Sequence, residues 1–304
     1  MTNMKHTRHP EYQYLDILQD ILDHGDKRMD RTGVGTLALF GRHMRFDVSN
    51  AFPVLTTRKI YWQTAAKEML WMLSGQTSIR PLLEQQVHFW TDWPWAKYRR
   101  ETGEEISRKD FETRVLEDRA FAEKWGDLGP VYGKQWRRWL TSDGREIDQI
   151  QGVIDQIKSS PRSRRILWTG WNVGELDQMA LPPCHKTYQA FVSGDGKLSL
   201  AVNQRSADFC IGVAGGNLIG LALLVHMLAK ETDLDPGEAI WYGMDVHVYL
   251  NHVEQAKEQL SRTPRPWPTF RIKRKAPTLF DYTIDDFELE GYDPHPPIKL
   301  PIAV

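Results

Sequence analysis

The sequence predicts one domain of mixed α/β architecture. Segments whose apolar residues recur every three to four positions alternate with segments in which they recur every second position, as in helices and strands. Of the 304 residues, 41% are hydrophobic and 26% charged, which is typical of a packed globular protein. No internal repeat and no low-complexity tract divides residues 1–304, so a single domain is the simplest account.

The first part of the chain predicts two helices and one strand. Residues 10–25 are expected to be helical because leucines and isoleucines recur there at helical spacing between a proline and a glycine. Residues 36–48 alternate as a strand does, with a bulge expected at Gly41. Residues 62–73 predict a second helix, and Glu68 lies within its mostly apolar turns.

The rest of the chain alternates between strands and helices. Ser193-Gly194-Asp195-Gly196 has the composition of a hairpin turn. The segment of about residues 94–125 is highly charged and has few large apolar side chains. This composition predicts a surface insertion or a small subdomain that carries no catalytic residues of its own. Helices are expected at 147–159, 217–230 and 251–260, and strands at 165–171, 186–192, 197–203 and 240–248.

The charge and the cysteines limit the environment of the protein. A net charge of −1 and a pI near 6.8 argue against general binding to nucleic acid or to an anionic membrane. Two cysteines are too few for a disulfide framework, and residues 1–10 lack the apolar core of a signal peptide, so we expect a cytoplasmic protein. The apolar run 212–229 predicts a buried helix with its entry loop, and a membrane span is the alternative.

Cys184 is a candidate nucleophile. Two prolines hold the backbone extended directly before it. If the following hairpin has a two-residue loop at 194–195, residue 184 faces Arg205, with Cβ atoms roughly 4.5–5.5 Å apart. A guanidinium at that distance favours the reactive thiolate. A longer turn would slip the register, and the alternative is that Cys184 is a small buried apolar side chain.

A series of motifs around this cysteine resembles the thymidylate synthase family. The match covers nearly the whole chain from about residue 11, and several long motifs in the correct order make it specific. They are Asp30-Arg-Thr-Gly33, Leu70-Trp71 with Gly75, Gly126-Asp-Leu-Gly-Pro-Val-Tyr-Gly-Lys-Gln-Trp136, Ser163-Arg-Arg165, Trp171-Asn-Val173, Leu181-Pro-Pro-Cys-His185, Gln204-Arg-Ser-Ala-Asp208, Gly243-Met-Asp-Val-His-Val-Tyr-Leu-Asn-His252, Gly291-Tyr-Asp-Pro-His-Pro296 and the terminal Ala303-Val304.

The resemblance implies the family's fold, a mixed sheet layered with helices whose sheets pack across a homodimer. It also implies methylation of dUMP at C5 to give dTMP, with 5,10-methylenetetrahydrofolate as donor of carbon and hydride and without a metal. A thiolate that adds to C6 makes C5 carbanion-like, which explains the need for a cysteine. The residues that match the family's catalytic positions are Cys184, Glu68, Tyr132, His185, Asp208 and Asn217.

Each catalytic position has its own implied role. Cys184 matches the nucleophile, and Glu68 matches the glutamate that organises water and moves protons. Tyr132 matches the tyrosine implicated in removal of the C5 proton. His185 belongs to the same network, and a purely structural histidine is an equally open reading.

The substrate positions gather arginines and hydroxyl groups, as recognition of a phosphate requires. Arg164 and Arg165 match a pair that reaches across from the other subunit, which implies an obligate dimer; read alone, they are a solvated charged pair. His247 and Tyr249 lie two apart on a strand and share a face, which suits joint binding of the sugar 3′-hydroxyl or a buried hydrogen-bonded pair. The substrate-binding matches are Arg31, Arg164, Arg165, Gln204, Arg205, Ser206, Asn217, His247 and Tyr249.

The folate positions combine aromatic and small side chains. The resemblance implies that the pterin stacks on Trp90 near Trp93 and bonds to Asp208, although the spacing of the two tryptophans alone favours core residues. The cofactor-binding matches are Trp90, Trp93, Leu181, Asp208, Ile211, Gly212 and Ala303.

One segment departs from the family pattern. The family has Gly-x-Pro-Phe-Asn, whereas Gly212 is followed here by Val213-Ala214-Gly215-Gly216-Asn217, which removes Pro-Phe and adds one residue. An asparagine at this place suits uracil, because its amide can donate to O4 and accept from N3–H. Thr91 also replaces an acid beside the pterin tryptophan.

This departure keeps two other functions open. The first is hydroxymethylation of dUMP, or action on dCMP, by a relative of the kind that viruses carry. The second is a non-catalytic binding protein, since family members bind RNA, although nothing in this sequence supports RNA binding. The retained Cys184, Glu68, Tyr132 and Arg205 argue against loss of catalysis.

Overall fold

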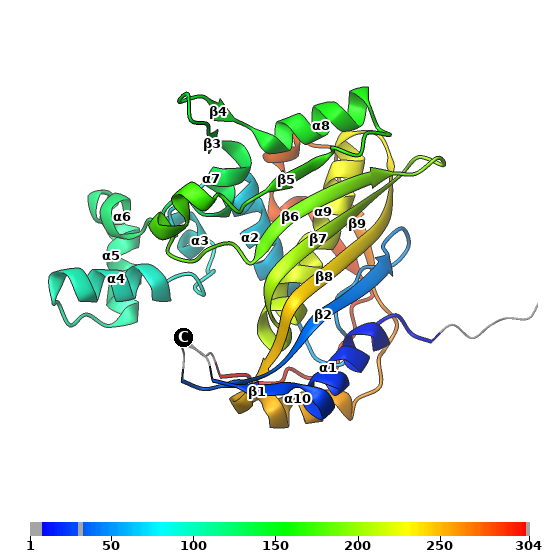
Figure 1. The fold of residues 1–304 in the computed structure, drawn as a ribbon, viewed down its shortest axis with the longest axis horizontal. Coiled ribbons are helices and arrows are strands. Elements are labelled where there is room, and N and C mark those ends of the chain that lie inside the picture. Colours follow the sequence, from blue (N-terminus) through cyan, green and yellow to red (C-terminus); the bar gives the residue numbers. More distant parts are fainter. Residues whose placement is uncertain (1–7, 30–32, 302–304) are drawn as a thin grey trace, which may run out of the picture.

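The computed structural model describes residues 8–29 and 33–301 and is built around one six-stranded mixed sheet (Figure 1). The order is β1-β2-β8-β7-β6-β5; β7 and β8 run parallel, and the other neighbours are antiparallel. The strands of this sheet are β1 (Asp26–Arg28), β2 (Thr36–Asp47), β5 (Leu167–Thr169), β6 (His185–Val192), β7 (Lys197–Asp208) and β8 (Asp235–Tyr249). Two small hairpins are formed by β3 (Trp139–Leu140) with β4 (Glu146–Ile147) and by β9 (Thr269–Ile272) with β10 (Phe287–Glu290).

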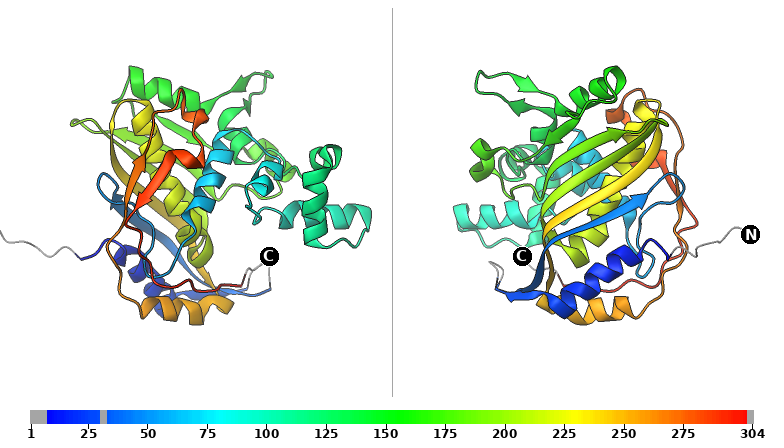
Figure 2. Two further views of the ribbon diagram at one scale, coloured as in Figure 1. Left: turned by 180° about the vertical axis from the view of Figure 1, so that it is seen from behind. Right: turned by 45° about the vertical axis from the view of Figure 1, so that its right-hand side comes forward.

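Helices cover one face of this sheet. The right-hand view of Figure 2 shows α2 and α9 behind the sheet, while no helix of the described residues crosses the middle strands on the opposite face. The helices are α1 (Tyr12–His24), α2 (Trp62–Leu73), α3 (Arg80–Glu84), α4 (Asp92–Thr102), α5 (Arg108–Glu117), α6 (Arg119–Trp125), α7 (Tyr132–Arg137), α8 (Gln149–Ser159), α9 (Leu218–Glu231) and α10 (Val253–Leu260). The predicted mixed sheet layered with helices is therefore confirmed.

The most apolar segment is the core helix. The π-helical segment η2 (Phe209–Asn217) leads directly into α9. Together they are long and apolar enough to cross a membrane by length and composition, but 67% of the most apolar window is buried inside the protein. This burial is that of a core helix packed on β7 and β8, as predicted for residues 217–230.

The turn between β6 and β7 is longer than predicted. The Ser193 N–H donates to the Lys197 carbonyl at 2.9 Å, and Gly196 adopts a φ of 82°, which a glycine adopts without strain. Three residues therefore form the loop, and the predicted two-residue turn was wrong. The outer pairs are shifted by one residue, so Val192 lies opposite Leu198.

A β-bulge near the start of β6 reverses this shift. The register changes between His185 and Thr187, and His185 then pairs with Gln204. The Arg205 N–H donates to the Cys184 carbonyl at 2.9 Å. The backbones of Cys184 and Arg205 thus lie opposite each other as predicted, because the longer turn and the bulge cancel.

The bulge predicted at Gly41 was wrong. Phe40 pairs with Asp245 and Arg42 pairs with Gly243, so the register between β2 and β8 is the same on both sides of the glycine. Gly41 instead adopts a φ of 76°, which locally distorts the strand without adding a residue.

The charged stretch of about 94–125 forms three short helices that project from the body (Figure 1, left). These helices, α4 to α6, have a small core of their own, in which Tyr98 contacts Phe111, Phe121 and Trp125 through ring edges or tilted faces. Salt bridges among α4, α5 and the loop between them account for much of the charge seen in the sequence.

Candidate active site

Cys184 lies directly before β6 and is partly exposed. Its backbone N–H donates to the Tyr132 hydroxyl at 2.7 Å, so α7 and the start of β6 meet at the cysteine. Tyr132 is buried, and burial raises the pKa of its hydroxyl well above 10. The hydroxyl therefore keeps its proton at neutral pH and can donate a hydrogen bond beside Cys184.

Arg205 holds the segment that carries the cysteine. Its Nε donates to the Pro183 carbonyl at 3.1 Å and its Nη2 to the Pro182 carbonyl at 2.8 Å. The guanidinium also lies over the Trp171 ring, 5.3 Å from the centroid. Two of the five guanidinium N–H groups are thus used within the protein, and the prolines before Cys184 are fixed from the neighbouring strand.

Glu68 is the acid of the site. The Trp90 indole N–H donates to Glu68 Oε1 at 2.8 Å. The residue keeps some exposed surface, but its carboxyl group is enclosed by protein, and this burial raises its pKa from 4.5 to about 7. An acid that titrates near neutrality is suited to give and to accept protons at physiological pH.

His185 is buried and neutral. Burial lowers its pKa from 6.5 to about 4, and a hydrogen bond with Asn217 only partly opposes this effect. Its Nδ1 lies 3.0 Å from the Tyr188 hydroxyl. In a regular strand residues three apart face opposite sides, and the bulge after His185 is what brings the two side chains to one face.

Asn217 is held by a chain of hydrogen bonds from the neighbouring strands β7 and β8. Gln204 Nε2 donates to Asn217 Oδ1 at 2.9 Å, and the Trp241 indole N–H donates to Gln204 Oε1 at 2.7 Å. Gln204 is buried, and its position is set by the parallel pairing of β7 with β8. With its oxygen engaged by Gln204, the Asn217 amide nitrogen is the group oriented to donate to a ligand.

The extra residue between Gly212 and Asn217 is accommodated by a wide helical turn. In a π-helical turn residues five apart are stacked, whereas in an α-helix residues four apart are. A Cβ added to Gly212 would lie 3.3 Å from Asn217 Oδ1, so the two positions are neighbours in space. Asp208 begins this segment, since its Oδ1 accepts from the backbone N–H groups of Cys210 and Ile211.

The glycines of η2 leave the backbone of this segment open to close approach. A Cβ added to Gly215 would meet no atom within 4 Å. One added to Gly216 would lie 3.8 Å from Glu68 Oε2 and 3.9 Å from Ala65 Cβ. Trp90 lies on the other side of Glu68, with its ring 5.2 Å from that of Trp93.

His247 and Tyr249 share a face of β8, as predicted, with their rings edge to face at 5.5 Å. His247 Nδ1 lies 2.9 Å from Asp245 Oδ1, and Arg28 Nη1 donates to Asp245 Oδ2 at 2.9 Å. Asp245 therefore orients the histidine, and its own pKa is lowered chiefly by the hydrogen bond with His247.

Arg164 and Arg165 lie in an exposed loop between α8 and β5. Among the described residues neither side chain has an ion pair with an acid. The Arg164 carbonyl accepts from the Gln189 side chain, which lies five residues along the strand from Cys184, ~15 Å away. The loop is therefore separated from the cysteine of its own chain by more than an arginine side chain can span.

The structure joins nine of the predicted site residues in three groups. The first is Cys184, Tyr132 and Arg205, the second is Glu68, Trp90 and Trp93, and the third is His185, Gln204 and Asn217. Ser206, Leu181, Ile211 and Gly212 are partly exposed around them. Arg31 and Ala303 lie outside the described residues.

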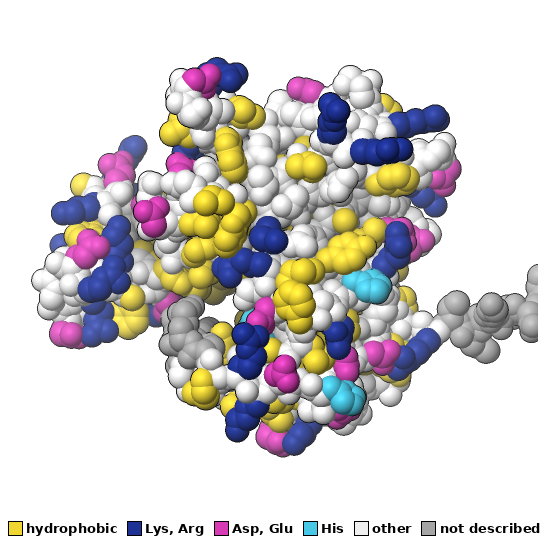
Figure 3. Space-filling model, viewed as in Figure 1, with side chains coloured by type: hydrophobic (Ala, Val, Ile, Leu, Met, Phe, Trp, Pro, Cys, Tyr) yellow, Lys and Arg dark blue, Asp and Glu magenta, His cyan; other side chains and the backbone are white. Residues whose placement is uncertain are grey.

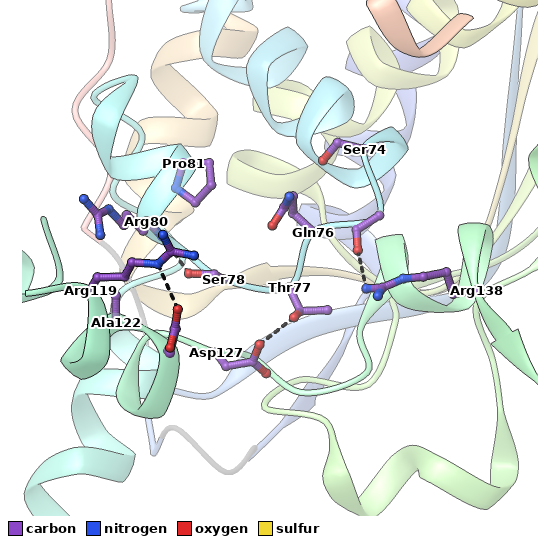
Figure 4. Close-up of a pocket in the computed structure, with 12 residues that line it drawn as sticks. Ser74, Gln76, Thr77, Ser78, Arg80, Pro81, Arg119, Ala122, Asp127 and Arg138 are labelled. Atoms are coloured by element: carbon purple, nitrogen blue, oxygen red, sulfur yellow. Dashed lines mark hydrogen bonds and ion pairs between the residues drawn. The ribbon is translucent and has the colours of Figure 1, made fainter. Parts of the chain in front are cut away.

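A separate polar cleft of about 740 Å³ lies where α2 ends (Figure 4). Its Arg80 and Arg119 each pair with a glutamate four residues further along the chain, and Arg138 donates to the Gly75 carbonyl at 3.0 Å. Of the predicted site residues that the structure describes, none lines this cleft. The candidate active site is therefore the region around Cys184.

Sequence reasoning did not find several residues that hold the site. Trp171 and Trp241 contact Arg205 and Gln204 from segments distant in sequence. Tyr188 reaches His185 only because of the bulge, and Glu112 on α5 contacts Thr91 beside Trp90, so no local motif marks any of them. The parallel pairing of β7 and β8, which depends on the whole fold, brings Trp241 to Gln204. The residues missed are Trp171, Tyr188, Trp241 and Glu112.

The site combines a cysteine, a buried tyrosine and an acid that titrates near neutrality. This combination is typical of an enzyme that acts by nucleophilic addition. The thymidylate synthase family model matches residues 12–304. The chain is 57% identical to the thymidylate synthase of Cereibacter sphaeroides (strain ATCC 17025) over 97% of this chain and 99% of that protein. It is 57% identical to that of Rhodopseudomonas palustris over 98% and 100%, and 55% identical to that of Sinorhizobium fredii over 98% and 100%.

The chain belongs to the thymidylate synthase family and is an enzyme of the methyltransferase class. The resemblance found in the motifs is thereby confirmed. These relatives do not favour the hydroxymethylation alternative or the non-catalytic alternative.

Proposed function

We propose that this enzyme converts dUMP to dTMP by methylation at C5. The observation that carries the proposal is the family match over residues 12–304 together with the Cys184, Tyr132 and Glu68 cluster. The co-substrate is 5,10-methylenetetrahydrofolate, as for thymidylate synthases generally, and the chain binds both dUMP and the folate.

The residues present fit a flat folate ring. A Cβ on Gly215 would meet no atom within 4 Å, so a ring can approach the backbone of η2 closely, and the partly exposed Trp93 packs beside the buried Trp90 that binds Glu68. We assign the folate to Trp90, Trp93, Leu181, Asp208, Ile211 and Gly212, with Ala303 outside the described residues. When bound, the folate supplies the one-carbon unit and the hydride.

The reaction begins at Cys184. Its thiolate adds to C6 of the uracil ring, which moves electron density to C5 and O4. Asn217 donates its amide N–H to O4, where negative charge develops, and Gln204 holds that amide in place. His185 is neutral at physiological pH and therefore adds no positive charge to this network.

Proton transfer is assigned to Tyr132 and Glu68. Tyr132 accepts from the Cys184 N–H and keeps its own proton, so its hydroxyl can relay a proton at C5. Glu68 titrates near neutrality and faces the open space beside η2, where it can exchange protons with O4 through water.

The nucleotide is held by its phosphate and its sugar. Arg205 has three guanidinium N–H groups beyond the two that bind the proline carbonyls, and we assign these, with Ser206 and Arg31, to the phosphate. His247 and Tyr249 are assigned to the 3′-hydroxyl, because Asp245 fixes the histidine ring beside the tyrosine.

We also propose a homodimer that forms through the open face of the sheet. Figure 3 shows hydrophobic side chains over this face. Tyr242 on β8, Phe191 on β6 and Leu167 on β5 alternate with buried neighbours and point away from α9, and 66% of Phe191 is exposed. Exposed apolar side chains spread over several strands of one sheet face are typical of a surface that another subunit covers.

Arg164 and Arg165 support a shared site. Since they lie ~15 Å or more along the strand from their own cysteine, a role in phosphate binding requires the active site of a second subunit. Mixing Cys184→Ser and Arg165→Ala subunits tests this. One intact site forms in each hybrid dimer, so random exchange should restore about a quarter of wild-type activity if dimers form freely. No recovery after proven exchange would refute the shared site.

The product identifies the reaction. Purified enzyme is incubated with methylenetetrahydrofolate and either dUMP or dCMP, and products are identified by mass spectrometry. We expect dTMP and dihydrofolate from dUMP, no product from dCMP, and no turnover by Cys184→Ser. A hydroxymethyl nucleotide with tetrahydrofolate would overturn the assignment. We also propose a cytoplasmic location, since Cys184 and Cys210 are not joined in a disulfide.

A further inference from the structure

The projecting helices reach the active site through α5. Glu112 is largely buried between α5 and the segment of residues 88–92. Its Oε1 accepts from the Thr91 hydroxyl at 2.6 Å, and its Oε2 lies 3.0 Å from His88 Nδ1. Both partners flank Trp90 in the chain.

Arg108, one turn earlier on α5, holds the same segment. Its Nε donates to Asp92 Oδ1 at 2.8 Å and its Nη2 donates to the His88 carbonyl at 2.5 Å. Its Nη1 lies 3.3 Å from Glu112 Oε1, which joins the two side chains on one face of the helix. The backbone on both sides of Trp90 is thus fixed from α5.

Trp90 transmits this position to the catalytic groups. Its indole N–H donates to Glu68, and its ring packs edge to face on Tyr132 at 6.1 Å. Tyr132 in turn accepts from the Cys184 N–H. A shift of the segment of residues 88–92 would therefore move the hydrogen bond to Glu68 and the ring against Tyr132 together.

We propose that Glu112 and Arg108 are positioning residues, through which the inserted helices α4 to α6 set the position of Trp90 against Glu68. Neither residue touches the reacting atoms. The inference rests on the proposed function, because it assigns Glu68 a role in proton transfer. It adds that the charged insertion contributes to catalysis instead of being a passive surface feature.

The pH profile of kcat reports this coupling. Of the buried groups around Glu68, Tyr132 and Tyr188 remain protonated and His185 remains neutral near pH 7, so among these groups only Glu68 can give the profile a limb, that is a rising or falling part, near neutrality. The Cys184 thiol is the other group of the site whose ionisation the reaction requires, and it makes no contact with Trp90 in the chain of interactions described above. The Trp90 hydrogen bond favours the carboxylate and lowers the pKa of Glu68. When that bond is lost, the limb must move to higher pH, whichever protonation state the reaction uses.

The test compares Glu112→Ala, Glu112→Gln and Arg108→Ala with Glu105→Ala, a change of a far more exposed acid in the same insertion. For Glu112→Ala we expect kcat to fall roughly tenfold, a fraction of the 10²–10⁴-fold that a positioned acid–base group supplies. The limb should move upward and the Kd for dUMP should not change. Glu112→Gln keeps an oxygen for Thr91 and should be partly rescued, which serves as the test if the alanine variant fails to fold.

A double mutant shows whether Glu112 acts through Trp90. In a Trp90→Phe background the indole donor is absent, so Glu112→Ala should cause no further loss of kcat. Effects that multiply, or a limb that stays in place in Glu112→Ala and Glu112→Gln, would overturn the proposal. If the wild-type enzyme itself makes no dTMP, the proposed function fails first, so the two failures are distinct.

Discussion

Replacing Glu68 by glutamine should stabilise the folded enzyme, and the gain should increase with pH. Burial raises the pKa of this carboxyl from 4.5 to about 7. Between these values the folded protein holds the proton while the unfolded chain releases it, so the stability of the wild type falls as pH rises through this window. Glutamine does not titrate and does not suffer this loss.

The size of the effect follows from the two pKa values. A carboxyl that titrates near 7 when folded costs about 3 kcal/mol at about pH 8.5 and about 1.4 kcal/mol at about pH 5.5. Glu68 keeps some exposed surface, and water near the carboxylate reduces the difference, so we expect about 1–2 kcal/mol between the two conditions.

Urea unfolding of both proteins at the two pH values measures this difference. The control is Glu105→Gln, whose side chain is 83% exposed and whose effect should not depend on pH. A gain for Glu68→Gln that is equal at both pH values would refute the buried, weakly acidic carboxyl. The variant should also lose most of its turnover, which would make Glu68 a group kept for catalysis at a cost in stability.

Two further outcomes follow from buried contacts. Glu11→Gln should destabilise the fold by about 3 kcal/mol or more. The carboxylate accepts hydrogen bonds from the N–H and hydroxyl groups of both Thr56 and Thr57, and the NH2 group of a glutamine would face some of these donors. Urea unfolding measures the effect, and an unchanged midpoint would contradict it. Asn217→Asp should lower kcat/KM for dUMP by about 10²-fold and strengthen dCMP binding. The reason is that a carboxylate still accepts from Gln204 but cannot donate to O4 of uracil. Steady-state kinetics with both nucleotides measures the change, and unchanged selectivity would contradict it.

The sequence predicted those elements whose periodicity is long and regular. Helix α2 has the predicted bounds, and α1, α9 and β8 lie where their apolar spacing placed them. Helices α1 and α2 and strand β8 bury one stripe or face, whereas α9 is apolar and buried nearly all round, and both patterns can be recognised in the sequence. Short elements such as β5 (Leu167–Thr169) are smaller than predicted because three residues give little periodic signal.

The hairpin shows what local patterns do not contain. Turn chemistry suggested a two-residue loop, and the bulge after His185 has no sequence signal of its own. The prediction that Cys184 and Arg205 lie opposite each other is correct, but it assumed a two-residue loop. The loop has three residues, and the bulge cancels the shift in register that the extra residue causes. The hydrogen bonds of the Arg205 guanidinium to the Pro182 and Pro183 carbonyls were not predicted.

The insertion was the least predictable region. Its charge suggested a solvated surface, but Glu112 and Arg108 lie against the segment that carries Trp90. Thr91 replaces an acid in the family pattern, and the structure places the Glu112 carboxylate against its hydroxyl. Thr91 and Glu112 are 21 positions apart, and one is a neutral hydroxyl residue while the other is an acid. Neither segment alone therefore predicts their contact.

The altered motif could change both the position of Asn217 and the shape of the proposed folate site. The wide turn of η2 keeps the first and leaves only the second changed. One residue more in an α-helix would rotate Asn217 by about 100° away from its neighbours. A π-helical turn absorbs that residue, so Asn217 still stacks above Gly212 and still accepts from Gln204. In place of the Pro-Phe side chains, the segment has open space at Gly215 and a bare backbone at Gly216 next to Glu68. The change therefore alters the wall of the proposed folate site, while the group proposed to read the base keeps its support from Gln204.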